Sequence, residues 1–279
     1  MVEEIKPVVA GKHKQSTLTK RDAEAALVSF PEVELVSGSK ERFSTTIGEF
    51  DRVLGGGLVE GMVVLVGGEP GVGKSTLLTQ MVLGLLSAEL GTILYVAGEE
   101  SPAQISLRIN RILKNESKSS SNKNWTTQPE ALQFFTATDV DLLTQTIAIH
   151  KPSLVIVDSI QSLSTQDLSG ASGSIGQLRE VSDRIISCVK PLGIPTVLVG
   201  HVTKEGSIAG PKVLEHMVDT VLELSGERSS QLRLLRALKN RFGATDEVGV
   251  FQLTDTGIVE VNNPSELFLE QREGGVSGS

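Results

Sequence analysis

The stretch from residue 68 to residue 75 constrains the fold of this chain more strongly than any other part of the sequence. It reads Gly-Glu-Pro-Gly-Val-Gly-Lys-Ser and fills every fixed position of the phosphate-binding P-loop pattern. An apolar run at 62–66 precedes it, and apolar residues at helical spacing follow over 75–90. A strand before such a loop and a helix after it distinguish a phosphate site from a glycine-rich turn, so we predict a phosphate site.

The loop also predicts its own chemistry. Glycines allow successive backbone N–H groups to turn toward a polyphosphate, Lys74 reaches the β and γ phosphates, and the hydroxyl of Ser75 ligates Mg²⁺. ATP and magnesium are therefore the expected cofactors. The predicted nucleotide-binding residues are Gly68, Glu69, Pro70, Gly71, Val72, Gly73, Lys74, Ser75 and Thr76.

A second apolar run ends in an acidic residue. Residues 154–157 are Leu-Val-Ile-Val, and Asp158 follows them. An aspartate at the carboxyl end of a buried strand beside a P-loop holds the magnesium shell through water, which is the Walker B role. Such strands are common by themselves, but one downstream of a complete P-loop favours the metal role for Asp158.

Strand and helix patterns alternate along most of the chain. The predicted strands lie at 62–66, 92–97, 132–136, 154–158 and 195–199, and the helices at 75–90, 102–113, 140–150 and 175–192. This alternation implies right-handed connections and a mainly parallel, twisted α/β sheet flanked by helices. Four further strand patterns, expected to extend the sheet as antiparallel hairpins, lie at 220–224, 232–238, 248–253 and 258–261.

Composition divides the chain into three parts. Residues 1–40 are polar and are expected to form a flexible arm, 41–262 to form the ATPase domain, and 263–279, rich in Gly and Ser toward the end, to form a linker. With one Trp and one Tyr, the core is left to Val, Leu and Ile, which suits a parallel sheet covered on both faces. The Ser-, Asn- and Lys-rich stretch 114–129 is expected to be a surface insertion.

Charge and cysteine content narrow the class of protein. The formal net charge of −8 argues against a generally cationic nucleic-acid coat but is compatible with a local basic channel. The single cysteine, Cys188, allows neither an intrachain disulfide nor a cysteine zinc cluster. No apolar run approaches the roughly 20 residues that span a bilayer. A soluble, cytoplasmic protein is expected, with no membrane partner and with an organellar location left open.

Hydrolysis of ATP needs a group that orients water, and two glutamates are candidates. Glu99 and Glu100 follow the strand at 92–97, which we expect to neighbour the P-loop strand. Glu99 is preferred because it lies nearer the strand end. The alternative, strongest for Glu100, is that these carboxylates only favour the start of the next helix through its dipole.

A cationic block, Lys-Asn-Arg-Phe-Gly at 239–243, is expected on a turn between two strands. Lys239 and Arg241 could form an exposed hairpin tip. They could instead act as a finger that reaches ATP bound to an adjacent subunit. Separately, the polar loop 201–211 follows the carboxyl end of a predicted strand, where open α/β sheets place their ligands.

Eight blocks of sequence, taken together, resemble one family. They lie at 52–58, 68–75, 98–101, 158–161, 200–206, 208–211, 214–219 and 239–243. This set is similar to the bacterial RadA (Sms) family of RecA-like DNA repair ATPases, over about residues 42–272. The block at 239–243 is the hallmark of that family, so the resemblance is far more specific than a P-loop alone.

The resemblance implies a homo-hexameric ring that binds ATP between subunits and moves on single-stranded DNA. Lys74 and Ser75 would bind phosphate and Mg²⁺, Asp158 would be the Walker B residue, and Glu99 would be the catalytic glutamate. Lys239 and Arg241 would act on the nucleotide of the next subunit.

DNA contacts are implied by the same resemblance. The loops 161–174 and 201–211 match the two loops that face DNA in RecA-like rings, which makes Lys204 the clearest phosphate-contact candidate, with Gly206 beside it. His201 would relay the state of the γ phosphate to the second loop, or merely cap the strand end.

Two function hypotheses remain open at this point. The first is a DNA-stimulated ATPase that promotes branch migration of recombination intermediates, with a RecA-type recombinase as a candidate partner. The second is an ATP-dependent assembly or regulatory module of the KaiC type, without motor activity. The RadA family typically begins with a four-cysteine zinc module and ends with a Lon-protease-like domain; this sequence shows neither, so no zinc is expected.

Overall fold

A computed structural model describes residues 42–116, 128–201, 211–227 and 230–261 of the chain. The chain divides into two units, Met1–Lys40 and Glu41–Ser279, and every described residue belongs to the second unit. The predicted arm at 1–40, the linker at 263–279 and most of the insertion at 114–129 lie outside the described residues.

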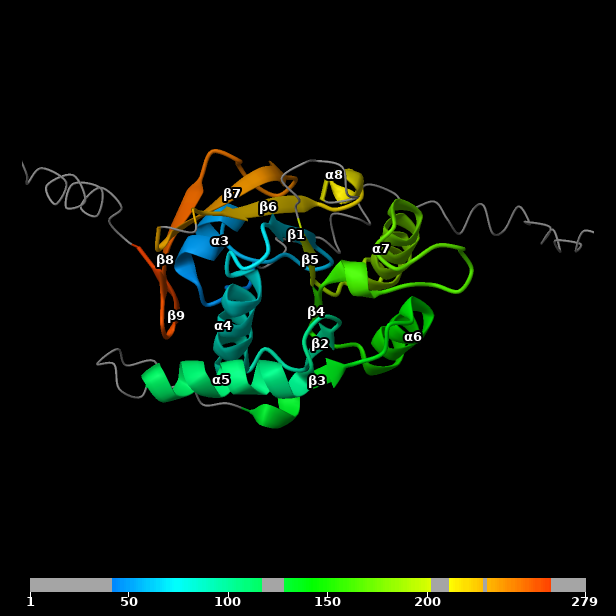
Figure 1. The fold of residues 1–279 in the computed structure, drawn as a ribbon, viewed down its shortest axis with the longest axis horizontal. Helices are drawn as coiled ribbons and strands as arrows, with labels where there is room; N and C mark the ends of the chain where they lie inside the picture. The colour runs from blue at the N-terminus through cyan, green and yellow to red at the C-terminus, as the bar shows by residue number, and fades with distance from the viewer. Residues whose placement is uncertain (1–41, 117–127, 202–210, 228–229, 262–279) are drawn as a thin grey trace, which may run out of the picture. The chain divides into compact units, whose positions relative to one another are not determined.

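One nine-stranded sheet organises the described chain, in the order β3-β2-β4-β5-β1-β6-β7-β8-β9 (Figure 1). Its strands are β1 (Val63–Gly68), β2 (Ile93–Ala97), β3 (Leu132–Phe135), β4 (Leu154–Asp158), β5 (Thr196–His201), β6 (Thr220–Ser225), β7 (Leu232–Asn240), β8 (Val248–Thr254) and β9 (Gly257–Glu260). The helices are α3 (Gly48–Leu54), α4 (Lys74–Ser87), α5 (Pro102–Glu116), α6 (Val140–His150), α7 (Ile175–Val189) and α8 (Pro211–Leu214), with 3-10 turns η1 (Pro129–Ala131) and η2 (Ile160–Ser162).

Strands β1 to β6 pair in parallel, and β7 to β9 add antiparallel pairs, so the predicted mixed α/β sheet is confirmed. Two details of the prediction were wrong. The strand before Glu99, β2, lies between β3 and β4, whereas β1 lies between β5 and β6. In addition, β6 pairs in parallel with β1 and only its other edge is antiparallel. Strand order is a long-range property, and periodicity along the chain does not encode it.

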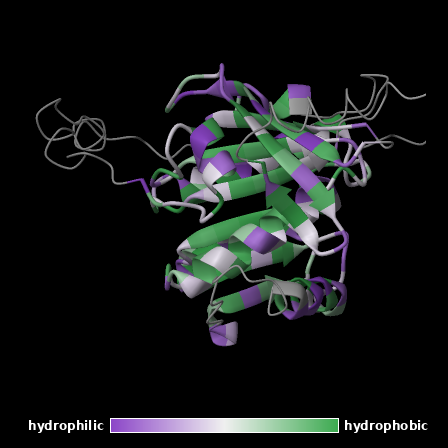
Figure 2. Cartoon of the chain, turned by 90° about the vertical axis from the view of Figure 1, so that its left-hand side faces the viewer, coloured by the Kyte–Doolittle hydropathy of each residue, from purple (hydrophilic) through white to green (hydrophobic). Residues whose placement is uncertain are grey.

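The central strands are buried on both faces because their residues alternate between two apolar clusters. Val64 and Val66 of β1 belong to a cluster that includes residues of α3, α4 and α5. Val63 and Leu65 belong to a second cluster, with residues of α6, α7 and α8. The helices accordingly lie in two layers (Figure 1), and the central strands are mostly green in the hydropathy view (Figure 2). Continuous Val, Leu and Ile runs are what a parallel sheet covered on both sides requires.

Several element ends differ from the sequence prediction by a few residues. Helix α4 ends at Ser87 with Ala88 as its C-cap, three residues before the predicted end at 90. Strand β5 runs to His201, which therefore belongs to the sheet and not to the following loop. Lys239 likewise lies within β7, so the cationic block begins in a strand and only Arg241 onward forms the turn.

The glycine-rich turn at 55–57 packs against the cationic block, although the two are far apart in the sequence. Asn240 Nδ2 donates to the carbonyl of Leu54 at 3.1 Å. Gly55 has φ of +83° and ends α3 in the left-handed conformation, and a Cβ built on it would lie 3.2 Å from the Cα of Gly243. Glycine at these two positions thus allows two backbones to approach closely.

Candidate nucleotide-binding site

The P-loop connects β1 to α4 at the carboxyl edge of the parallel strands. Gly71 and Gly73 have φ of +79° and +116°, which L side chains rarely adopt. A Cβ on Gly73 would also lie 2.8 Å from Cδ1 of Ile258 on β9. Both conformation and packing therefore require glycine in this loop.

Lys74 begins α4 and lies folded beneath the loop. It is 4% exposed, and its Nζ donates to the carbonyl of Gly68 at 2.8 Å and to that of Glu69 at 3.0 Å. Burial lowers the pKa of Lys74, and the nearby carboxylates of Asp158 and Glu99 oppose that shift. The ammonium is therefore a buried cation whose hydrogen bonds go to backbone carbonyls of the loop.

Glu99 and His201 form a polar row with Lys74. His201 Nε2 lies 2.8 Å from Glu99 Oε1, and His201 Nδ1 lies 3.3 Å from Lys74 Nζ. Because an ammonium can only donate, its contact favours Nδ1 as the acceptor, so that Nε2–H donates to Glu99. Ser159, which follows the Walker B candidate, also donates its hydroxyl to Glu99.

Asp158 ends β4 and is 6% exposed. The hydroxyl of Tyr95, from β2, donates to Asp158 Oδ2 at 2.8 Å. Burial, followed by the charge of Asp158, raises the pKa of Tyr95 well above its ordinary value, so the phenol remains a donor. One carboxylate oxygen is thereby held in place. Tyr95 was not among the predicted site residues. The available signal was that it is the single tyrosine of the chain and lies on the strand before Glu99.

The two neighbouring glutamates have separate surroundings. Glu100 forms an ion pair with Arg108 of α5, and Arg108 Nη1 also lies 3.4 Å from Thr79 Oγ1 on α4. Glu99 faces His201 and Ser159 instead. Glu100 thus joins β2 to α4 and α5, whereas Glu99 lies with the P-loop lysine.

These residues fit a magnesium–ATP complex, the ligand that the P-loop pattern implies. A magnesium–nucleotide complex needs anion-binding N–H groups, a cation for the phosphates and oxygen ligands for the metal. The loop glycines provide the N–H groups, Lys74 provides the cation, and the hydroxyl of Ser75 and the carboxylate of Asp158 provide the oxygen ligands. Ser75 and Thr76 lie in the first turn of α4, where the helix dipole favours anions.

Lys239 and Arg241 lie at the opposite edge of the sheet from the P-loop of their own chain. Asn240 pairs with Thr220, the first residue of β6, and Thr220 pairs with Val64 near the start of β1. Lys239 Nζ donates to the carbonyls of Glu215 and Val218, each at 2.7 Å. The structure therefore does not bring this pair to the Lys74 site of the same chain.

A buried carboxylate, Asp219, anchors that edge and was missed by sequence reasoning. Its Oδ2 accepts from the backbone N–H of Val63 at 3.0 Å, and Oδ1 accepts from Lys190 at 2.7 Å and from Arg241 at 3.4 Å. Asp219 is 3% exposed. An aspartate directly before a predicted strand, at the end of the block 214–219, was the available signal.

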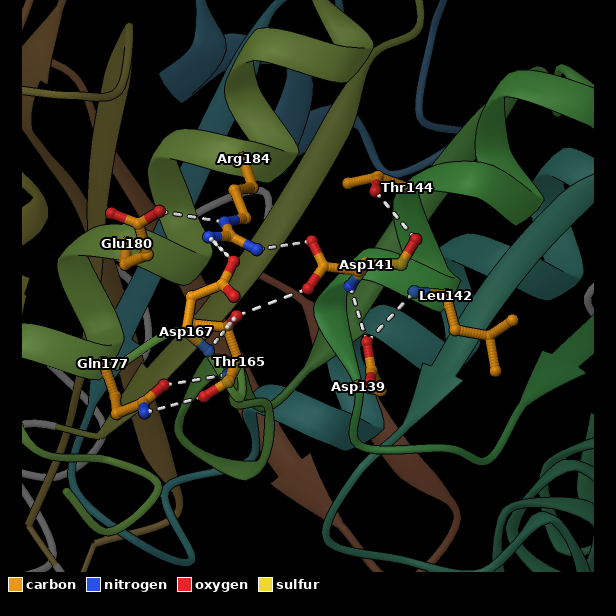
Figure 3. A network of polar contacts seen from close by, with 9 residues as sticks. All are labelled: Asp139, Asp141, Leu142, Thr144, Thr165, Asp167, Gln177, Glu180 and Arg184. Atoms are coloured by element: carbon orange, nitrogen blue, oxygen red, sulfur yellow. Dashed lines mark hydrogen bonds and ion pairs between the residues drawn. The ribbon is translucent and has the colours of Figure 1, made fainter. Parts of the chain in front are cut away.

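The loop that follows β4 is anchored by the network in Figure 3. Gln177, 1% exposed on α7, bonds both backbone groups of Thr165 at 2.9 and 3.0 Å. Arg184, about two turns further along α7, bonds Asp141 of α6 and Asp167 at 2.5 and 2.7 Å. The stretch after η2 is thus fixed to both α6 and α7. The other predicted DNA loop, including Lys204 and Gly206, lies outside the described residues.

A mainly parallel sheet with a P-loop at its carboxyl edge, an aspartate at the end of the strand two positions away and a glutamate after β2 defines a RecA-like P-loop ATPase. The comparisons agree: a family model described as "ATPase: KaiC" matches residues 43–266. The chain belongs to this KaiC-type ATPase family.

Within the family, the predicted likeness to RadA proteins is confirmed. The chain is 47% identical over 249 residues to the DNA repair protein RadA of Bacillus subtilis (strain 168), covering 89% of this chain and 51% of that protein. It is 45% identical over 246 residues to the protein of the same name from Streptococcus pneumoniae, covering 88% and 55%. The chain thus spans about half the length of the curated relatives it matches.

A solved structure supports the fold alone. The crystal structure of the RadB recombinase aligns with a TM-score of 0.58 and 22% sequence identity, covering 78% of this chain and 99% of that one. Nowhere in the described ranges is a helix both long and apolar enough to traverse a bilayer.

Proposed function

We propose that this chain hydrolyses ATP within a homo-hexameric ring on single-stranded DNA and promotes branch migration of recombination intermediates. The observation that carries the proposal is the row of Lys74, His201 and Glu99, in which the P-loop lysine, the last residue of β5 and the candidate water-orienting carboxylate are in contact. The likeness to proteins named DNA repair protein RadA supports the choice of DNA repair.

Each residue of the site would have a separate role in hydrolysis. When bound, Mg-ATP supplies the phosphoryl group and a cation that offsets its charge. Lys74 would exchange its two carbonyl partners for phosphate oxygens, and Ser75 and Thr76 would bind at the start of α4. Asp158, held by its tyrosine, would fix water around the metal. Glu99 would orient the attacking water once its hydrogen bond to His201 is given up.

Hydrolysis would require a neighbouring subunit. Lys239 and Arg241 lie at the far edge of their own sheet, so a nucleotide that they contact would belong to another chain. Arg241 is the better finger, since its side chain is 55% exposed, while Lys239 is engaged with two carbonyls of its own chain. A guanidinium also matches phosphate geometry better than an ammonium does.

His201 connects the nucleotide to the DNA in this proposal. It is the last described residue before 202–210, the loop to which Lys204 and Gly206 were assigned. Breaking the Glu99–His201 hydrogen bond on ATP binding would release the end of β5. A RecA-type recombinase is the proposed protein partner, and the cytoplasm the proposed location.

A second candidate is an assembly module in which ATP controls only oligomerisation, and the KaiC name of the family model favours keeping it. The test is the steady-state ATPase rate with and without single-stranded DNA, over a series of protein concentrations. Lys74→Ala, measured alongside, gives the background. Stimulation by DNA that rises steeply with protein concentration supports the ring motor. A rate that follows assembly but ignores DNA supports the module.

A further inference from the structure

Arg233 is a buried cation on β7 that the ATPase chemistry described above does not use. It is 5% exposed. Its guanidinium is bonded by backbone carbonyls: those of Ser230 and Leu232 at 2.6 and 2.8 Å, that of Glu227 at 3.3 Å, and that of Val72 at 3.0 Å. Burying a guanidinium is costly unless its N–H groups are bonded, and here four backbone carbonyls bond them.

The bond to Val72 reaches into the P-loop. Arg233 Nε–H donates to the carbonyl of Val72, which belongs to the same planar, trans peptide unit as the N–H of Gly73. In such a unit the C=O and N–H point in opposite directions. Holding the carbonyl toward Arg233 of β7 therefore points the Gly73 N–H away from β7.

The surroundings make Arg233 a rigid anchor for that peptide. Its Nη1 bonds tie the guanidinium to the β6–β7 connection, and a Cβ on Gly226 would lie 2.6 Å from its Cδ. Ile258 of β9 also lies close to Gly73, and Gln80 of α4 bonds the N–H and C=O of Ile258 at 2.7 and 2.9 Å. The peptide after Val72 is thus bonded by β7, and the glycine that follows it is in close contact with β9.

We propose that Arg233 is a positioning residue for nucleotide binding, which orients the Gly73 N–H toward the phosphates by holding the Val72 carbonyl. This inference rests on the proposed binding of ATP at the P-loop. It also gives the antiparallel strands a role in the site of their own chain, because a residue of β7 sets the geometry of a loop that follows β1.

The experiment compares Arg233→Met, Arg233→Lys and Arg236→Met, the last being an exposed arginine three residues along the same strand. The dissociation constant for ATP is measured by calorimetry well below each unfolding midpoint, which is recorded separately without nucleotide. Arg233→Met should raise the dissociation constant by about tenfold, the size of effect that loss of one charged hydrogen bond produces. Arg233→Lys, which keeps a cationic donor, should recover part of the affinity, and Arg236→Met should bind as the wild type does.

The outcomes separate this inference from the proposed function. If the wild-type chain binds no ATP, the proposed function fails. If it binds ATP and Arg233→Met binds equally well while unfolding at a lower temperature, Arg233 is structural only and the inference is overturned. Should Arg233→Met not fold, Arg233→Lys decides: an affinity below that of the wild type is expected, and an equal one overturns the inference.

Discussion

The two ends of the parallel strands both carry charged clusters, and the clusters are built in opposite ways. At the carboxyl end, Lys74 is buried among backbone carbonyls, and Glu99, with a side chain 42% exposed, reaches it only through His201. At the amino end, the carboxylate of Asp219 is buried and is bonded directly by a backbone N–H and by two cations.

This difference separates a site from a structural anchor. Burial lowers the pKa of Lys74, so its charge is not well stabilised within the chain and an anion would stabilise it further. The Asp219 carboxylate already has its donors. We therefore expect changes at the carboxyl edge to alter nucleotide chemistry and changes at the amino edge to alter stability, with Arg241 as the exception.

The largest effect is expected for Lys74→Ala, which should abolish ATP binding because the buried cation for the phosphates is gone. The free energy of unfolding should not fall, since a poorly stabilised buried charge is removed. Calorimetric titration with ATP tests the loss of binding, and urea unfolding tests the free energy of unfolding. Lys114→Ala, at an exposed lysine of α5, is the control. A marked loss of stability in Lys74→Ala would break the distinction between the two edges.

Arg241→Ala should lower kcat by roughly a thousandfold, as removal of an arginine finger does in related chemistry. Binding of ATP by the single chain should be unchanged. Stability should fall by no more than about 1 kcal/mol, because the contact with Asp219 is long and the side chain is exposed. Steady-state rates of assembled protein test this, with Arg236→Ala as the control. Normal hydrolysis would show that the far edge is structural throughout.

Glu99→Gln should lower kcat by about a hundredfold, the effect of losing a group that activates water, with ATP affinity retained. Glu100→Gln is the matched comparison, because it changes the adjacent carboxylate, which is paired with Arg108. That variant should retain most of its rate. Single-turnover hydrolysis of both variants measures the contrast. Equal rates for the two would remove Glu99 from the catalytic assignment.

Asp219→Ala should lower the free energy of unfolding by about 3 kcal/mol, because the Val63 N–H and the Lys190 ammonium lose their buried acceptor. Affinity for ATP, measured where the variant is folded, should change little. Urea unfolding is the measurement. Asp183→Ala, at an exposed aspartate of α7, should lie within about 0.5 kcal/mol of the wild type. A stable Asp219→Ala would contradict the anchor role.

The smallest effect concerns pH. Burial, followed by repulsion from Arg241, lowers the pKa of Lys239 from its ordinary 10.5. Between the lowered pKa and 10.5 the unfolded chain binds more protons than the folded chain, so stability should rise with pH over this window. Arg241→Ala should shrink that rise, since it removes the repulsion, and Arg236→Ala should not. Urea unfolding across this window tests it; an unchanged slope in Arg241→Ala would contradict the coupling.

Much of the fold could be predicted because its signals are local. Helix α6 was predicted at its observed bounds, and β4 likewise, since apolar periodicity and the capping residue Asp139 act over a few residues. The P-loop was recognisable for the same reason, because local backbone conformation requires its glycines. The neighbours of β1 were not predicted correctly, and neither Asp219 nor Arg233 was assigned, because each depends on which strands meet.

The sequence by itself determined the chemical groups: a phosphate loop with its lysine, an aspartate at a strand end, a glutamate after β2 and a cationic block at 239–243. Tertiary structure alone decided which of them meet. It brought Glu99 and His201 to Lys74, set Asn240 against the carbonyl of Leu54, and directed Arg233 at the carbonyl of Val72. The physical reason is that these contacts join residues many positions apart, whose distance follows from strand order and register and not from any short-range preference of the chain.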